Sequence, residues 1–208
     1  MNPGKTPAHR GPIALLVLVL ATLVWSGIGP RDRFTWVLEV FPVLLAIPLL
    51  MALYPRWRFP DLVYVLIAGH AIILIIGGHY TYAEVPLFNW LRDSLHLTRN
   101  HYDRVGHFAQ GFVPAMIARD VLLRRSPLRP GKWLIFIVIC ICLAISAVYE
   151  LIEWQAAFWS GTAADAFLGG QGDPWDTQKD MALALVGATL ALVLLSRWHD
   201  RQMARLTR

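Results

Sequence analysis

The sequence predicts an all-helical membrane protein, a single integral domain with about six transmembrane helices and both termini in the cytoplasm. Three observations support this fold class. Of the 208 residues, 56% are hydrophobic and only 16% are charged, and the mean hydropathy of +0.48 is too high for an ordinary soluble domain. The apolar residues are gathered in six runs of about the length that crosses a bilayer. The basic residues are concentrated in alternate connections between these runs.

The six predicted spans cover residues 13–29, 34–53, 62–80, 105–123, 133–159 and 177–198. The first run follows a short segment with Lys5 and Arg10, an arrangement that signal peptides share. We interpret it as a retained helix, because it has span length and no small-residue cleavage site follows. The second run contains Pro42 and Pro48, which membrane helices tolerate when neighbouring groups satisfy the freed carbonyls.

The charge distribution sets the expected orientation and partners. With a cytoplasmic N-terminus, the cytoplasmic segments carry 13 Lys and Arg residues and the opposite side carries 6, which favours both termini inside. Residues 81–104, interpreted as a long loop, are then periplasmic. The net charge of +5 is not gathered in a basic domain separate from the apolar runs, so no nucleic-acid partner is expected. The expected partners are membrane lipids, and the oligomeric state is left open.

Ionisable residues cluster where three of the predicted spans begin or end. These pairs are Asp103 and His107, Glu150 and Glu153, and Asp176 and Asp180. Members of each pair are three or four residues apart, so on a helix they share one face. All three pairs fall in the outer leaflet of the predicted topology. Because an uncompensated charge inside a span costs ~3 kcal/mol, such groups face the bundle interior or water. The sequence therefore predicts one shared site that opens toward the periplasm.

Several carboxylates and one imidazole suit the binding of one or two divalent cations. The predicted metal ligands are Asp103, His107, Glu150, Glu153, Asp176 and Asp180. Such a site can activate water against an ester or phosphate, and the expected substrate is a lipid or envelope precursor. In this hypothesis Glu150, Glu153 and Asp180 are catalytic. Arg104 binds an anionic head group and Gln171 contacts the substrate.

Two other hypotheses stay open at this point. The first is a proton- or ion-coupled transporter in which Glu150 and Glu153 form a relay, and it requires a polar path to the cytoplasmic side. The second is a non-catalytic membrane subunit whose acids pair with Arg104 or Lys179 in a structural network. His70 at mid-span is interpreted as a packing residue. The sequence contains no phosphate loop, dinucleotide fingerprint or H-E-x-x-H motif.

Four separated motifs carry a resemblance to a known family. They are G-H-Y-T-Y-A-E from Gly78, N-H-Y-D-R-V-G-H-F from Asn100, A-x-S-A-x-Y-E-L-I-E-W from Ala144, and F-L-G-G-Q-G-D-P-W-D-T-Q-K-D-M from Phe167. With these motifs the chain resembles the YjdF-type bacterial inner-membrane proteins, a family of unknown function. The resemblance implies a multi-pass protein of the bacterial cytoplasmic membrane.

A more distant resemblance is to VanZ-like proteins, which are associated with teicoplanin resistance. The matching positions are Asp103, Arg104, His107, Phe108, Ser146, Glu150, Asp180 and Gly187. Ala184 stands where that family usually has Asn, and this departure weakens a transfer of antibiotic resistance. Neither resemblance implies an established activity.

Overall fold

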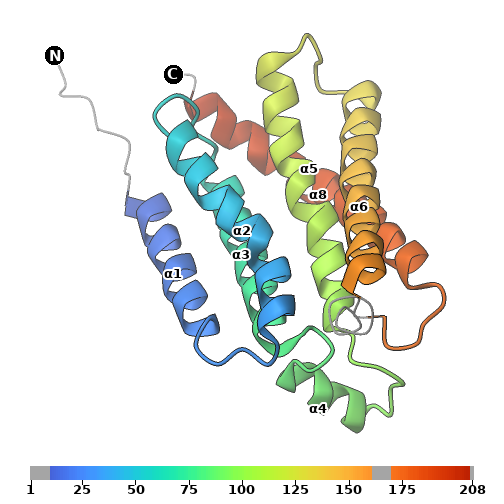
Figure 1. Ribbon diagram of the computed structural model, residues 1–208. Coiled ribbons are helices and arrows are strands. Elements are labelled where there is room, and N and C mark those ends of the chain that lie inside the picture. The colour runs from blue at the N-terminus through green and yellow to red at the C-terminus, as the bar shows by residue number, and fades with distance from the viewer. Residues whose placement is uncertain (1–9, 161–169, 207–208) are drawn as a thin grey trace, which may run out of the picture.

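A computed structural model of the protein describes residues 10–160 and 170–206, and every regular element in that part of the chain is a helix (Figure 1). The helices are α1 (Arg10–Ser26), α2 (Arg33–Leu53), α3 (Asp61–Tyr80), α4 (Pro86–Ser94), α5 (Tyr102–Arg125), α6 (Lys132–Ser160) and α8 (Asp176–Leu206). The prediction of an all-helical fold is confirmed. Each predicted span corresponds to one of these helices, and α8 continues past the predicted end at residue 198.

Four of the helices, α2, α3, α6 and α8, are long and apolar enough to cross a membrane. Helix α1 is apolar but has only 17 residues. Helix α5 has 24 residues, and its charged side chains, which include Asp103 and Arg119, keep it from being an apolar helix. A multi-pass membrane protein therefore follows from the described helices, while the total of six spans and the cytoplasmic position of the termini stay predictions.

Helix α4 corrects the interpretation of residues 81–104 as a loop. Pro86 starts the helix, at a position where the missing N–H is not needed. The nine residues of α4 mix apolar and polar side chains, and Leu87 and Trp90 are exposed. Because the helix is short and has no continuous apolar run, its sequence lacks the signature of a membrane span.

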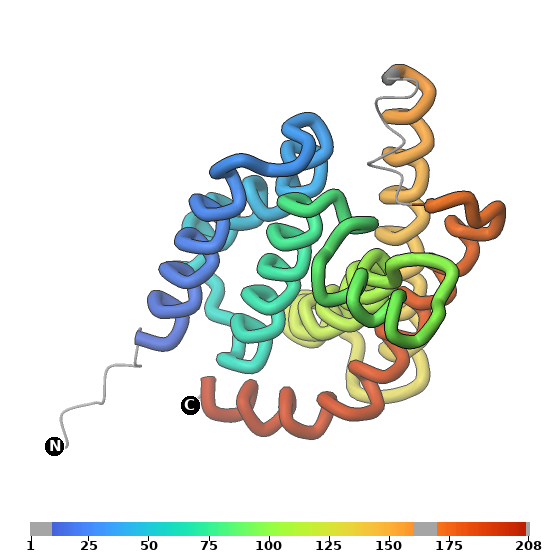
Figure 2. The backbone as a smooth tube through the Cα atoms, turned by 90° about the horizontal axis from the view of Figure 1, so that it is seen from below, coloured from blue at the N-terminus to red at the C-terminus, as the bar shows by residue number. Residues whose placement is uncertain are grey.

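The helices form two groups that lie side by side (Figure 2). In the first group α1 and α2 each pack against α3, and in the second α6 and α8 pack against α5. Contacts between α3 and α5 join the groups. The C-terminal part of α8 also reaches α3, where the backbone N–H of Leu62 donates to Gln202 Oε1 at 2.9 Å.

Helices α5 and α8 cross closely because each presents a glycine at the contact. A Cβ atom on Gly111 would collide with the backbone carbonyl of Ala184, and a Cβ atom on Gly187 would collide with the backbone of Phe108. Small residues at a crossing let two membrane helices approach at backbone distance. This crossing brings Asp180 of α8 next to the first turns of α5.

An apolar layer separates the two ends of the second group. It contains Val63 from α3, Met116 from α5, Leu134 and Val138 from α6, and Ala188 from α8, all of them buried. Acidic and basic side chains gather on either side of this layer. One gathering lies where α5 and α8 begin, and the other lies where α5 ends.

Candidate functional site

Asp103, His107 and Asp180 form a compact triangle at the crossing of α5 and α8. One donor atom from each of the three residues lies within 4.8 Å of the other two. His107 Nε2 is 3.3 Å from Asp103 Oδ1 and 3.9 Å from Asp180 Oδ1, and all three side chains are buried. Two carboxylates and an imidazole in this arrangement are a ligand set for a divalent cation such as Mn²⁺ or Zn²⁺.

Both ring nitrogens of His107 face oxygen atoms. While Nε2 faces the two aspartates, Nδ1 is 3.3 Å from Gln110 Oε1 and 3.6 Å from Glu150 Oε1. A neutral imidazole carries only one N–H, so one nitrogen would face acceptors without a proton between them. A rotated Gln110 amide, a second ring proton or a cation bound at Nε2 would each resolve this conflict.

Two arginines neutralise the aspartates on the loop side of the triangle. Arg104 pairs with Asp180, with Asp176 at 2.6 Å and with Asp173 at 3.2 Å. Arg99 pairs with Asp176 at 2.6 Å and with Asp103 at 3.4 Å. These contacts tie the start of α5 to the start of α8.

Lys179 adds a third cation at the edge of this network. Its Nζ lies 2.6 Å from Asp173 Oδ2. This hydrogen bond, with a further one from the backbone N–H of Trp175, lowers the pKa of the Asp173 carboxyl, which lies outside the spans. Asp173 is therefore ionised at neutral pH.

Gln171 holds the two loops that flank the network. Its Oε1 accepts from the backbone N–H of Asn100 at 3.0 Å, and its Nε2 donates to the Asn100 carbonyl at 2.9 Å. The Asn100 side chain is fully buried and caps α5 by accepting from the backbone N–H of Tyr102. Gln171 itself has a φ of 46°, in the left-handed region, which fixes the turn before α8.

Helix α6 contributes two carboxylates, Glu150 and Glu153, that pair with no Lys or Arg in the described part of the chain. Glu150 Oε1 is buried without a hydrogen bond, and Glu153 is 9% exposed. Neither residue makes an ion pair with Lys or Arg in the described part of the chain, and the same is true of buried Glu39 on α2.

The site as a whole therefore carries excess negative charge. Seven carboxylates gather around three cationic side chains and one imidazole: Asp103, Asp173, Asp176, Asp180, Glu39, Glu150 and Glu153. Burying an unpaired carboxylate costs several kcal/mol, so the surplus has to be balanced by protons or by bound cations.

A cavity of about 140 Å³ opens beside the triangle, at the junction of the two helix groups. Its polar wall contains Asp103 and His107 from α5, Glu39 from α2, His70 from α3 and Glu153 from α6. Tyr82 and Tyr149 also line it, and Tyr149 Oη donates to Glu39 Oε2 at 3.4 Å. Burial raises the pKa of the Tyr82 phenol, which lies in the turn after α3, well above its ordinary value, so Tyr82 stays a neutral donor.

Backbone geometry places Tyr82 in this wall. Thr81 and Tyr82 both have positive φ values, 59° and 45°, where α3 ends, and the ring of Tyr82 packs against Gly77 and Gly106. Any side chain on Gly77 would overlap the ring. This strained turn directs the ring back into the bundle instead of into the loop.

The structure brings most of the residues that the sequence singled out into one place. Asp103, His107 and Asp180 meet directly, Glu150 faces His107, and Glu153 lines the cavity. Asp176 is placed differently, since it pairs with Arg99 and Arg104. Arg104 and Gln171, expected at the substrate, bind aspartates and the Asn100 backbone. Residues 167–169 of the fourth motif lie outside the described residues.

Three residues of the site were not selected from the sequence. Arg99 was assigned to a loop, although its spacing of four from Asp103 is the signal that would have found it. Glu39 interrupts an apolar run and has no charged residue within four positions, and Tyr149 is uncharged, so its place beside Glu150 does not mark it as a site residue. Their contact is made between α2 and α6 and depends on the tertiary fold.

A second buried polar cluster lies at the other end of α5. Arg119 donates to His199 Nδ1 at 2.7 Å and binds both carboxylate oxygens of Asp200. His199 Nε2 is 3.3 Å from Asp120 Oδ2, and Asp120 also accepts from Trp57 Nε1 at 3.2 Å. Every charge here has a close partner, so the cluster joins α5 to the end of α8.

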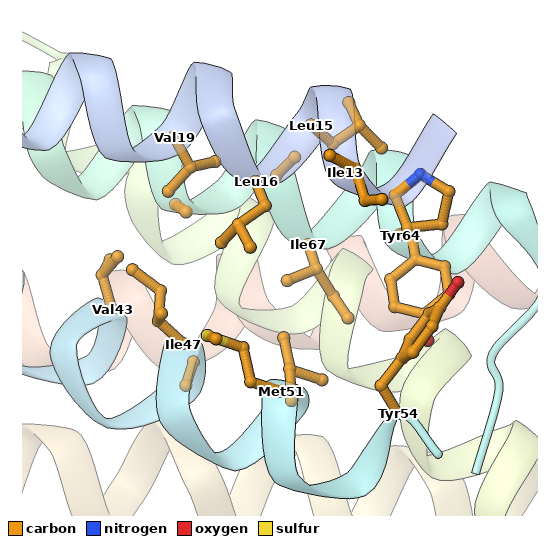
Figure 3. Close-up of a pocket in the computed structure, with 15 residues that line it drawn as sticks. Ile13, Leu15, Leu16, Val19, Val43, Ile47, Met51, Tyr54, Tyr64 and Ile67 are labelled. Carbon is orange, nitrogen blue, oxygen red and sulfur yellow. The ribbon is translucent and has the colours of Figure 1, made fainter. Parts of the chain in front are cut away.

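A separate hollow of about 350 Å³ lies between α1, α2 and α3 (Figure 3). Figure 3 shows that aliphatic side chains such as Leu16, Val43 and Ile47 line it, with Tyr54 and Tyr64 at one end. Apart from the Tyr54 and Tyr64 hydroxyl groups, the described residues that line it are apolar, so the candidate chemistry belongs to the smaller polar cavity.

Comparison with known proteins gives the family. Residues 11–201 match the family described as Predicted membrane protein (DUF2238). The chain is also 50% identical over 183 residues to Inner membrane protein YjdF of Escherichia coli (strain K12). These 183 residues are 88% of each of the two chains. No solved structure matches it. The resemblance to VanZ-like proteins stays a prediction. The chain therefore belongs to the DUF2238 family of membrane proteins and is an inner-membrane protein with several apolar helices.

Proposed function

We propose that this protein is a metal-dependent membrane hydrolase that acts on an ester or phosphate bond of a lipid or envelope precursor. The observation that carries the proposal is the triangle of Asp103, His107 and Asp180, buried beside carboxylates that no described Lys or Arg pairs with. A divalent cation bound there balances part of the excess negative charge and satisfies Nε2 of His107.

Glu150 is placed to orient His107, because it faces the ring nitrogen opposite the one that would bind the metal. Its Oε1 is free of hydrogen bonds and lies 3.6 Å from the Nδ1 atom of His107, on the side away from the aspartates. A metal held by Asp103, His107 and Asp180 would supply an activated water for attack on the ester or phosphate bond. Glu153 is the carboxyl group of α6 that faces the cavity where the substrate would lie.

Arg104 has a positioning role in this proposal in place of the head-group role expected from the sequence. Its guanidinium is occupied by Asp173, Asp176 and Asp180. Residues that hydrogen-bond a metal ligand orient it, and their loss typically lowers metal affinity about 10–100-fold. Arg104 thus holds Asp180 toward His107.

The apolar layer supports an enzyme over a transporter. An ion-coupled transporter needs a polar path between the two ends of the bundle, whereas Val63, Met116 and Val138 are buried between the cavity and the Arg119 cluster. The purely structural alternative draws support from the pairing of Arg99 and Arg104 with four aspartates. It gives no role to Glu150 and Glu153.

Metal binding by the purified protein tests the proposal. We expect wild-type protein, titrated with Mn²⁺ after chelator treatment, to bind at least one ion, and Asp180→Asn to bind it at least about tenfold more weakly. Asp93→Asn is the matched control, because Asp93 lies on α4 with its side chain 68% exposed. Glu150→Gln should retain the ion but lose hydrolysis of lipid extracts, followed by mass spectrometry. Wild-type protein that binds no divalent ion above the level of Asp180→Asn contradicts the proposal.

A further inference from the structure

The cavity wall away from the triangle carries two buried carboxyl groups, those of Glu39 and Glu153. Glu39 is 4% exposed and Glu153 is 9% exposed, and they reach the cavity from α2 and α6, which pack against different neighbours. Glu39 accepts a hydrogen bond from Tyr149. Glu153 makes no hydrogen bond or ion pair in the described part of the chain, so a nearly buried carboxylate faces the cavity without a partner.

The backbone adds acceptors to the same wall. Pro42 and Pro114 both line the cavity, and proline lacks the N–H that would bond the carbonyl four residues earlier. Pro114 thereby leaves the carbonyl of Gln110, a residue of the same wall, without its helical donor. The arginines of the site lie on the other side, bound to aspartates. Among apolar side chains such as Leu74 and Ile145, the wall thus presents the carboxyl groups of Glu39 and Glu153, which a ligand with positive charge and several N–H donors complements.

The cavity is larger than a single ion requires. Its volume is about 140 Å³, whereas a water molecule takes about 30 Å³ of liquid volume. A small organic group with a charged end therefore fits better than a bare metal ion. A primary ammonium group offers three N–H donors, which the carboxyl oxygens of Glu39 and Glu153 can accept.

The position of the cavity indicates how such a group arrives. It lies where the two helix groups meet, and a hydrogen bond from Tyr149 to Glu39 joins α6 to α2 there. Ile145, which lines the cavity, is 41% exposed, and its neighbours Val148 and Ile152 are exposed on the same helix. The opening is thus bordered by apolar side chains of a helix that has the composition of a span. A lipid can enter there sideways from the bilayer.

From these observations we propose that Glu39 and Glu153 form a subsite for the primary ammonium head group of a lipid, which enters between α2 and α6. The inference rests on the proposed function, because the hydrolase would then act on lipids whose head group is an aminoalkyl phosphate. The ammonium group occupies the Glu39 and Glu153 side of the cavity. The phosphate then lies toward His107 and the candidate metal ligands.

Lipid retention measured by native mass spectrometry tests the subsite. Purified protein in detergent is titrated with phosphatidylethanolamine and with phosphatidylglycerol of identical acyl chains. We expect wild-type protein to retain the ethanolamine lipid about tenfold better, as expected for one ion pair worth about 1.4 kcal/mol. Glu39→Gln combined with Glu153→Gln keeps the shape of the wall but removes its charge, and should reduce the preference to less than twofold. Asp93→Asn should behave as wild type.

Further arms separate this inference from the metal proposal. Asp180→Asn should lose Mn²⁺ binding and keep the preference for the ethanolamine lipid. A protein that binds no metal but keeps this preference would contradict the metal proposal and leave the subsite intact. Equal retention of both lipids by wild-type protein, or an unchanged preference in the Glu39 and Glu153 double variant with an unchanged melting temperature, overturns the subsite. Loss of a bound Mn²⁺ ion from the double variant without a change in lipid preference also overturns it, because the cation would then be a metal.

Discussion

The close crossing of α5 and α8 provides the sharpest test of how the site is built. In Gly111→Ala the new Cβ atom would lie closer than 3.0 Å to the backbone O, C and Cα atoms of Ala184, a distance that Cβ contacts do not reach. Backbone atoms cannot rotate away as side chains do, so the two helices must separate by about 1 Å. Overpacking of this kind costs about 1–3 kcal/mol, and we expect the upper end of that range.

The same separation should weaken the candidate metal site. Asp103 and His107 lie on α5 and Asp180 lies on α8, and their donor atoms are at most 4.8 Å apart. An extra 1 Å between the helices takes Asp180 out of reach of an ion held by the other two, since metal–ligand distances tolerate about 0.2 Å. Gly111→Ala should therefore lower both the free energy of unfolding and the affinity for Mn²⁺.

Gly69→Ala is the matched control for this experiment. Gly69 is also helical, but its Cβ atom would meet nothing within 4 Å, so alanine should be neutral or stabilise the protein by up to about 1 kcal/mol. Unfolding in mixed micelles with increasing SDS gives the stability difference, and titration with Mn²⁺ gives the affinity. If Gly111→Ala matches Gly69→Ala in both measurements, α5 and α8 do not cross as described.

Three further predictions concern the charged clusters. Arg104→Gln should lower the free energy of unfolding by about 3–5 kcal/mol, because it leaves buried aspartates without their cation. A double variant in which Asp180 is also neutralised should recover part of this loss. If the losses of the two single variants simply add in the double variant, Arg104 and Asp180 do not pair directly. The pKa of Asp173 is lowered in the folded protein, so its pairing with Lys179 contributes full stability above the unfolded pKa of about 4. This contribution is lost as the pH falls through the lower folded pKa. Hydrogen exchange of the turn before α8 should therefore rise below pH 4 in wild-type protein but not in Asp173→Asn. Arg119→Gln should cost about 1–3 kcal/mol through the unsatisfied Nδ1 of His199 and leave Mn²⁺ affinity unchanged, and a loss of Mn²⁺ binding would show that the two clusters are coupled.

The pairs at the helix ends could be selected from the sequence because each is local. Asp103 and His107 are four residues apart, and helix geometry alone places them on one face. That Asp180 joins them could be expected only in outline, from the topology. Arg104 and Asp180 are 76 positions apart, and no local rule indicates that Arg104 points to aspartates instead of to a ligand.

Glu39 illustrates a different limit. A carboxylate in an apolar run indicates that something balances it, but the sequence does not say what. In the fold its partner is Tyr149, 110 positions away on another helix. Gly78 lets α2 and α3 pack closely beside this contact, since a Cβ atom there would lie 3.1 Å from Glu39 Cβ and Glu39 would have to shift slightly.

The sequence by itself determined that this protein is helical, apolar enough for the membrane, and supplied with acids where its helices begin and end. These properties follow from composition and from periodicity within single helices, which do not depend on which helix packs against which. Only the tertiary structure decided which acids share a cation. That choice depends on the approach of backbones at Gly111 and Gly187 and on the junction between two helix groups, and such contacts join residues that are distant in the chain.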